Sequence, residues 1–437
     1  MASFKELVED YSRHQVPEEK TVGGIHIGII IIGVGITITA FILGSQMGLN
    51  LGFWDSLYAF YLGGFLLAVV AAFTGAVGAS ARLSTAMIIR TTFGESGAIF
   101  VNLVLTLVMM GWCIVLAAFF GDALLAGLET NWKFSAFSRD FYVALGSSIM
   151  ALITIFGFKA LDKQSLIMVP MMLAFLLVIL TWALKQANLA TIASVAPTTA
   201  TDIGLGAATS IVVGSFIVGA TVFPDVCRYG RNRTQATIGS FIAFLVGYPI
   251  ILILSAIPSI VTGEMDLMKV VAMLGLGFLG FFFLVFASLT TGTFQLYSAS
   301  LAAAALFKID KWKLVIIIAA VTAVIAVFFS IEYFLDWLTF LSILIPPISG
   351  IYVTHFLLIK LRHDSRYIAP KISFPAFGAW MLGAVVAYLT HIGTLRFTAI
   401  SAIDAILVAS FAYYLLQTMT EKIGADKIAG RHNHTDV

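Results

Sequence analysis

Two stretches of the 437-residue sequence decide the fold: IHIGIIIIGVGITITAFILGSQMG at residues 25–48 and IGLGAATSIVVGSFIVGATVFPD at residues 203–225. Each is long enough to cross a bilayer as a helix, since about 20 apolar residues span the hydrocarbon core. Each also carries two glycines near its middle, Gly33 with Gly35 and Gly214 with Gly219. Glycine-interrupted segments at matching positions in two halves of a chain indicate inverted repeats with a binding site at the membrane midplane. The alternative is that these small residues only let helices pack closely.

The composition excludes most other classes of protein. Hydrophobic residues make up 60% of the chain, charged residues only 11%, and the mean hydropathy is +1.01, so neither a soluble domain nor a disordered chain fits. The net charge of +2 predicts no nucleic-acid partner, and two cysteines cannot form a disulfide framework. The sequence has no phosphate-binding Gly-Lys-Ser/Thr loop, no His or Cys cluster for a metal and no nucleophile with a nearby base, so we expect no enzyme.

The spacing of charged residues divides the chain into twelve nearly uncharged stretches, and each predicts one transmembrane helix. They run from Lys20 to Asp55, Asp55 to Arg82, Glu95 to Asp122, Asp140 to Lys159, Lys163 to Lys185, Asp202 to Asp225, Arg233 to Glu264, Lys269 to Lys308, Lys313 to Glu332, Asp336 to Lys360, Lys371 to Arg396 and Arg396 to Glu421. We therefore expect an all-α membrane protein with 12 transmembrane helices. The predicted divisions are an N-terminal tail (1–24), a first five-helix repeat (25–186), a second (203–357), helices 11 and 12 (373–418) and a C-terminal tail (419–437).

The distribution of Lys and Arg predicts the orientation. With the N-terminus in the cytoplasm, 20 of the 25 basic residues lie on the cytoplasmic side, as the positive-inside rule requires. Both tails are therefore expected to be cytoplasmic. The loop after the sixth span holds one acidic and three basic residues. Its Asp225 and Arg228 are spaced i, i+3 and could form an ion pair. Arg231 and Arg233 remain for lipid phosphate or another loop, and the loop is either a basic anchor or a gate.

The eighth predicted span contains a polar face that suits a cation. The carbonyl of Ala287 and the hydroxyls of Thr290 and Thr291 are spaced i, i+3, i+4 and share one side of a helix. A hard monovalent cation needs about five oxygens, and the carbonyls at a break around Gly33 to Ile36 could complete the set. The alternative is that each threonine hydroxyl bonds back to a carbonyl of its own helix.

Several of these stretches resemble one known family. GSFIVGATVFPDVCRYGRN at 214–232 is similar to the sixth helix and following loop of the bacterial cytosine permeases of the nucleobase:cation symporter-1 (NCS1) family. WLTFLSILIPPISG at 337–350 resembles their tenth helix, and weaker matches are Gly111–Trp112 and the Thr-Thr pair with Leu296–Tyr297. The resemblance implies a five-plus-five inverted repeat of the leucine-transporter type with two further C-terminal helices. It also implies a location in the bacterial inner membrane.

The same resemblance implies sodium coupling and a planar substrate. Carried over by position, the sodium ligands are the carbonyls of Gly33, Ile36 and Ala287 and the hydroxyls of Thr290 and Thr291. The substrate ring would stack between Trp112 and Phe216, where two aromatic faces supply on the order of 1 kcal/mol each.

The polar side chains around that ring differ from those of the cytosine permeases. Met109, Val218 and Gly292 stand where those proteins have Gln, Ser and Asn, so cytosine itself is not the expected substrate. Replacement partners for a polar ring edge are Gln295, Thr293 and Ser342, together with the backbone near Ser215 and Gly219.

We therefore expect a secondary active symporter that imports a small neutral nitrogen heterocycle with sodium and works as a monomer in the lipid bilayer. Neutrality is favoured because no acidic or basic residue lies mid-span in helices one, three, six, eight or ten. The alternatives are a proton-coupled or uncoupled permease for another nitrogen compound, such as a vitamin precursor or an amine, and a non-transporting sensor.

Overall fold

The computed structural model describes residues 10–132, 137–195, 204–264, 269–270, 273, 277–307, 309–329, 340–359, 370–395 and 397–432. Within these ranges the regular elements are helices, and an isolated β-bridge joins Val22 to Gly230. In chain order the helices are η1 (Glu18–Lys20), α2 (Gly24–Gly35), α3 (Ile38–Ala81), α4 (Thr85–Phe93), α5 (Gly97–Trp132), α6 (Arg139–Ile155), α7 (Phe158–Gln186), α8 (Leu189–Ser194), α9 (Leu205–Thr221), α10 (Pro224–Cys227), α11 (Arg233–Ser240), the π-helix η2 (Phe241–Gly247), α12 (Tyr248–Thr262), α14 (Gly277–Leu306), α15 (Lys311–Val327), α17 (Pro346–Thr354), the π-helix η4 (His355–Ile359), α18 (Phe374–His391) and α19 (Ser401–His432).

An all-helical membrane protein is confirmed as the fold class. Nine helical segments of the described ranges are long and apolar enough to cross a membrane. Three of the twelve predicted spans do not meet that length as single helices. The first predicted span is divided between α2 and the beginning of α3, and α3 itself turns at Gly52 (φ 75°). The fourth and ninth predicted spans correspond to α6 and α15, which have 17 residues each. The count of twelve and the inverted repeat stay predictions.

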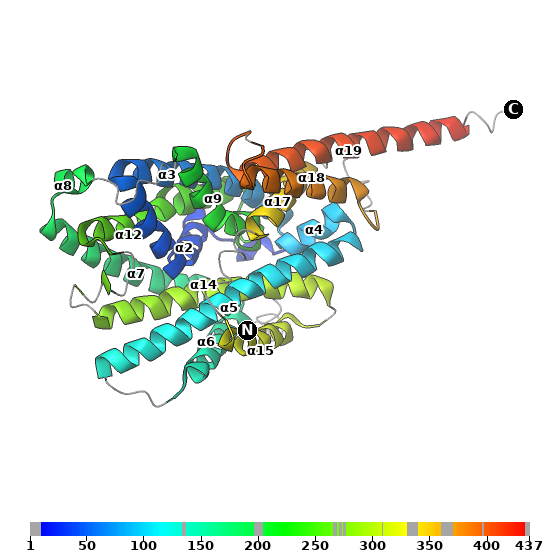
Figure 1. Ribbon diagram of the computed structural model, residues 1–437. Helices are drawn as coiled ribbons and strands as arrows, with labels where there is room; N and C mark the ends of the chain where they lie inside the picture. The colour runs from blue at the N-terminus through cyan, green and yellow to red at the C-terminus, as the bar shows by residue number, and fades with distance from the viewer. Residues whose placement is uncertain are drawn as a thin grey trace.

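The helices form one bundle in which α14 lies deepest. In Figure 1, α5 and α14 run side by side through the bundle, while α18 and α19 lie together along one edge. In the apolar 18-residue stretch of Gly280–Leu306 in α14, 83% is buried inside the protein, whereas only 33% of the corresponding stretch of α18 is buried. α3 packs along α12 and α9, and α2 contacts both α7 and α14. This arrangement brings the end of α2 to the polar face of α14.

The predicted interruption of the first span is present. α2 ends at Gly35, Ile36 leaves the helical conformation, and Thr37 is extended (φ −129°, ψ 159°). The hydroxyl of Thr37 then accepts a hydrogen bond from the amide of Ala40 at 3.0 Å and so caps the next helix. Because the last carbonyls of a helix have no partner within it, the carbonyls of Gly33, Val34 and Gly35 are available to other groups.

The predicted interruption of the sixth span lies elsewhere than expected. α9 is continuous through Gly214 and Gly219 and ends at Thr221, so the break falls at Val222 and Phe223 near one end of the span. The mid-span prediction was wrong because glycine tolerates a helix, whereas Pro224 lacks an amide hydrogen and clashes with the carbonyl four residues earlier. That carbonyl, of Ala220, accepts instead from the hydroxyl of Thr74 at 2.8 Å.

Candidate functional site

The break in the first span is held against α14 by a threonine. The Thr291 hydroxyl donates to the carbonyl of Val34 at 3.0 Å, and Thr291 is buried. This bond crosses between two helices rather than returning to its own, so the alternative reading of a local back-bond does not describe Thr291. A hydroxyl that donates its hydrogen keeps its lone pairs for another ligand. Thr291 and the freed carbonyls of α2 therefore form one oxygen-rich contact.

Thr290 is placed differently from its neighbour. Its hydroxyl lies 3.0 Å from the carbonyl of Phe286 and 3.1 Å from that of Ala287, both in its own helix. This is the back-bond that serine and threonine commonly make in apolar helices. It also keeps the Thr290 and Ala287 oxygens beside one another, and Ala287 and Ile36 are fully buried. The predicted sodium ligands thus lie on the two elements that Thr291 joins.

A small cavity opens beside this contact. Its volume is about 40 Å³, and it is bounded by the break of the first span, α5, α9, α12 and α14. The residues that line it are Val34, Gly35, Thr37, Thr39, Ala40, Trp112, Ser215, Phe216, Val218, Gly219, Tyr248, Thr291 and Gln295. Sites for small organic ligands usually exceed about 300 Å³, so the walls must separate before a ring can enter.

Aromatic side chains form the apolar walls of the cavity. Trp112 of α5 and Phe216 of α9, which we expected to stack on the substrate ring, both line it and are more than nine-tenths buried. The Phe216 ring also packs edge-on against Tyr248 of α12, with ring centroids 4.9 Å apart. A Cβ atom on Gly35 would lie 3.1 Å from Phe216, so this glycine lets the broken helix approach the ring closely.

Gln295 brings to the cavity a polar group with an unmet hydrogen-bonding need. Its side-chain oxygen is buried and has no hydrogen-bond partner, and the residue is only 7% exposed. Burying an amide oxygen without a partner costs about 1–3 kcal/mol. Since Gln295 lies one helical turn after Thr291 and lines the same cavity, a ligand with an N–H group would satisfy it.

Four of the predicted substrate residues do not line this cavity. The Thr293 hydroxyl donates to the carbonyl of Leu289 in its own helix at 2.6 Å and accepts from Gln164 of α7. A Cβ atom on Gly292 would meet Met150 of α6 at 2.5 Å, so Gly292 faces that helix. Met109 borders a second, smaller cavity together with Asp225 and Ser298. Ser342 is half-buried on the segment Phe340–Leu358 and is not among the residues that bound the central cavity. Of the three positions where a polar residue of the cytosine permeases is replaced, only Val218 lines the central cavity. The replacements at Met109 and Gly292 therefore do not change the polarity of that cavity.

The sequence reasoning missed two hydroxyl pairs at the cavity. Tyr248 and Ser215 share a hydrogen bond of 2.7 Å, and so do Thr37 and Thr39. Thr37 and Thr39 follow the Gly33–Gly35 interruption, which is the signal that could have singled them out. Tyr248 lies in an apolar run and nothing in the sequence distinguishes it from the other tyrosines of the chain, whereas its partner Ser215 was among the residues named from the sequence.

The chain matches one family along nearly its whole length. A family model described as "Permease for cytosine/purines, uracil, thiamine, allantoin" matches residues 15–415. The chain belongs to this permease family. The permease is therefore a membrane transporter and not an enzyme, and the predicted resemblance to NCS1 cytosine permeases is confirmed.

Curated relatives agree with this assignment. The cytosine permease of Escherichia coli (strain K12) is 27% identical over 361 residues, which cover 81% of this permease and 83% of the relative. The cytosine permease of Escherichia coli O157:H7 matches over the same length with the same identity.

Solved structures show the shared fold. Mhp1, a nucleobase-cation-symport-1 family transporter in a closed conformation with bromovinylhydantoin bound, aligns with a TM-score of 0.83 at 16% identity and covers 94% of this chain and 96% of its own. Mhp1 in its inward-facing conformation gives a TM-score of 0.74 at 17% identity over 93% of both chains. A Na⁺-coupled sialic acid symporter gives 0.65 at 13% identity over 95% of both chains. The permease thus shares the fold of these proteins.

Proposed function

We propose that this permease is a sodium-driven symporter that imports a small, neutral, planar nitrogen heterocycle. The observation that carries the proposal is the buried, unpartnered amide oxygen of Gln295 in a cavity walled by Trp112 and Phe216. A flat ring fits between aromatic faces, and an N–H on its edge would meet the Gln295 oxygen. With Val218 in place of a polar side chain, this pocket would pair fewer groups than cytosine presents, so cytosine itself is not the proposed substrate.

The coupling ion is proposed from the oxygens that meet beside the cavity. The ligands would be the carbonyls of Gly33, Ile36 and Ala287 and the hydroxyls of Thr290 and Thr291. The Thr291–Val34 hydrogen bond already holds the two ligand-bearing elements together at 3.0 Å. A cation there would tie the break of the first span to α14 and favour the conformation in which those elements touch. Sodium thereby binds one state better than the other, which is the condition for coupling.

The membrane arrangement is part of the proposal. We place the protein in the bacterial inner membrane with both termini in the cytoplasm, five-plus-five repeated spans and two further helices, active as a monomer. The basic residues support this orientation because most of them fall on the side of the two tails.

Thermal-shift screening of the purified permease tests the proposal. The compounds are nucleobases, hydantoins, vitamin precursors and small amines, each with sodium or with choline as the replacing cation. We expect a planar heterocycle to raise the melting temperature in sodium and to do so much less in choline, as ligand linkage requires. An amine that stabilises equally in both salts would contradict both the substrate class and the ion.

A further inference from the structure

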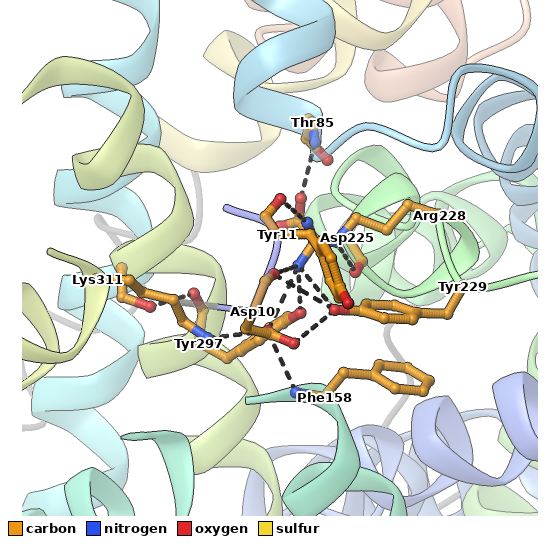
Figure 2. A network of polar contacts seen from close by, with 10 residues as sticks. Asp10, Tyr11, Thr85, Phe158, Asp225, Arg228, Tyr229, Tyr297 and Lys311 are labelled. Carbon is orange, nitrogen blue, oxygen red and sulfur yellow. Dashed lines mark hydrogen bonds and ion pairs between the residues drawn. The ribbon is translucent and has the colours of Figure 1, made fainter. Parts of the chain in front are cut away.

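A cluster of buried charges joins the N-terminal segment to one end of the helix bundle. Its members are Asp10 of the segment, Arg228 and Tyr229 after α10, Tyr297 of α14 and Lys311 at the start of α15, and we call them the end cluster (Figure 2). The side chains of Arg228 and Lys311 are completely buried, and that of Asp10 is 9% exposed. Charged side chains are almost never buried this far without a paired role.

Asp10 is the anion that joins the end cluster. Its carboxylate accepts from Lys311 Nζ at 2.9 Å, from the Tyr229 hydroxyl at 2.5 Å and from the backbone amide of Phe158 at 3.2 Å (Figure 2). Arg228 lies 3.5 Å from the same carboxylate. One side chain from outside the bundle thus connects the beginning of α7, the turn after α10 and the beginning of α15.

Arg228 binds the backbone of the N-terminal segment as well as its side chain. It donates to the carbonyl of Tyr11 at 2.8 Å, to that of Asp10 at 3.0 Å and to the Tyr297 hydroxyl at 2.7 Å. Arg228 does not form a hydrogen bond with the Asp225 carboxylate, its predicted partner. Arg228 reaches the backbone carbonyl of Asp225, while the Asp225 carboxylate accepts from the amide of Thr85.

The residues that follow extend this attachment over the ends of two more helices. Arg13 donates to the carbonyl of Ala304 in the last turn of α14 at 2.8 Å and to that of Ile309 just beyond the helix at 2.6 Å. Gln15 donates to Ala81 at 3.1 Å, and the amide of Val16 donates to Arg82 at 3.0 Å, at the end of α3. Residues 10–16 therefore lie as a strap across the ends of α3, α7, α10, α14 and α15.

The strap balances charges that would otherwise repel. Lys311 Nζ lies 4.4 Å from the centre of the Tyr297 ring, and the Arg228 guanidinium lies 6.0 Å from it, so two buried cations flank one ring. Asp10 contacts both. Without its carboxylate, the cations on α15 and after α10 would face each other in a poorly solvated site, and removing one partner of a buried ion pair is strongly destabilising. The seated strap and the closed end of the bundle thus depend on one another.

The end cluster is also close in sequence to residues that border the two cavities. Tyr297 precedes Ser298, and Ser298 and Asp225 border the second small cavity with Met109, which comes one turn before the Trp112 of the central cavity. The residues that border the second cavity thus neighbour both the end cluster and the wall of the central cavity in sequence.

We propose that residues 10–16 are a latch on the cytoplasmic exit, seated when that side is closed and released when it opens. The inference rests on the proposed transport function and its orientation. The latch makes the N-terminal segment a moving part of transport, with Asp10 as its positioning residue. It assigns the loop after the sixth span to gating, through Arg228, rather than to a basic anchor alone.

Accessibility of an introduced cysteine tests the latch in the full-length protein. In a background of Cys113→Ser and Cys227→Ser, Ser298→Cys places one thiol in the second cavity, and a membrane-impermeant maleimide is added to the cytoplasmic side of vesicles. We expect Asp10→Asn to raise the labelling rate at least tenfold. The matched control is Glu19→Gln, which removes the same charge from an exposed side chain of the same tail, and it should leave the rate unchanged.

Equal labelling of Asp10→Asn and the parent, with equal melting temperatures, would overturn the latch. If Asp10→Asn does not fold, Arg13→Gln decides instead, since it loosens the strap without touching the buried charges. A raised rate supports the latch, and an unchanged rate contradicts it. The labelling needs no substrate, so a failure to find a transported heterocycle would leave its result intact.

Discussion

The hydroxyl of Thr291 offers the sharpest test of the proposed cation site. Thr291→Val keeps the shape of the side chain and removes one oxygen, so the carbonyl of Val34 loses a hydrogen bond of 3.0 Å in a buried contact. An unsatisfied buried acceptor costs about 1–3 kcal/mol. If the Thr291 hydroxyl is also a sodium ligand, the sodium-bound state loses a contact of similar size. At about 1.4 kcal/mol per tenfold change, the sodium affinity then drops roughly fivefold to 100-fold.

The assay is a sodium titration of the melting temperature at fixed ionic strength, with choline as the replacing cation. We expect the half-saturating sodium concentration of Thr291→Val to rise by that factor. Thr106→Val is the matched control, because the Thr106 hydroxyl is buried and bonds at 2.8 Å to Asn102 within its own helix. An unchanged sodium titration in Thr291→Val, with a loss of stability no larger than in the control, would refute a ligand role for this hydroxyl.

Three further predictions concern the substrate, the aromatic wall and the strap. Gln295→Leu should weaken the stabilising effect of the heterocycle at least tenfold and leave the sodium titration unchanged, because it removes an acceptor from the ligand only; an unaltered ligand response would reject the role of its amide. Trp112→Phe should keep most of the ligand affinity and Trp112→Ala should lose about tenfold, as isothermal titration would show, since a ring face is worth on the order of 1 kcal/mol; equal losses would argue against stacking. Burial alone would raise the pKa of Asp10, but the charges of Lys311 and Arg228 outweigh it and hold that pKa below its ordinary value. The stability that Asp10 gives is therefore complete above about pH 4 and is lost only as the pH falls through the lowered pKa. The thiolate fraction of any cysteine changes with pH, so the Ser298→Cys labelling rate is divided by that of the unfolded protein at the same pH. This ratio should stay constant between about pH 7 and about pH 5; a steep rise as the pH falls through that range would contradict a charged Asp10.

The sequence predicted the first break and misplaced the second for a local reason. At Gly33 to Thr37, two glycines are followed by a residue that caps the next helix, so the break and the new start are encoded together. After Gly214 and Gly219 the hydroxyls of Ser215 and Thr221 bond back to carbonyls of their own helix and cap no new one. The helix ends at Thr221, shortly before Pro224, whose missing amide was visible in the sequence. Proline therefore located this helix end better than glycine did.

The cavity was predictable in part. Trp112, Phe216, Val218, Gly219 and Gln295 line it as expected, because residues at helical spacing on a polar or aromatic face point the same way. The orientation of Gly292 depends instead on how α14 turns toward α6, which no spacing within α14 reveals.

The strap lies beyond sequence reasoning. Arg228 and Asp10 are 218 positions apart, and both lie in polar stretches. From sequence alone, such stretches are equally compatible with side chains exposed to water at the ends of the helix bundle. Only packing shows that the cation is buried and that its partner comes from the tail.

Uptake by purified permease in proteoliposomes tests the central claim most directly. An inward sodium gradient is imposed with a heterocycle that passed the thermal-shift screen, and the same vesicles are measured without a gradient and with an inward proton gradient. We predict transient accumulation above the external concentration only with the sodium gradient, and its loss in Thr291→Val. Accumulation driven by protons alone, or equilibration that ignores both gradients, would contradict the account.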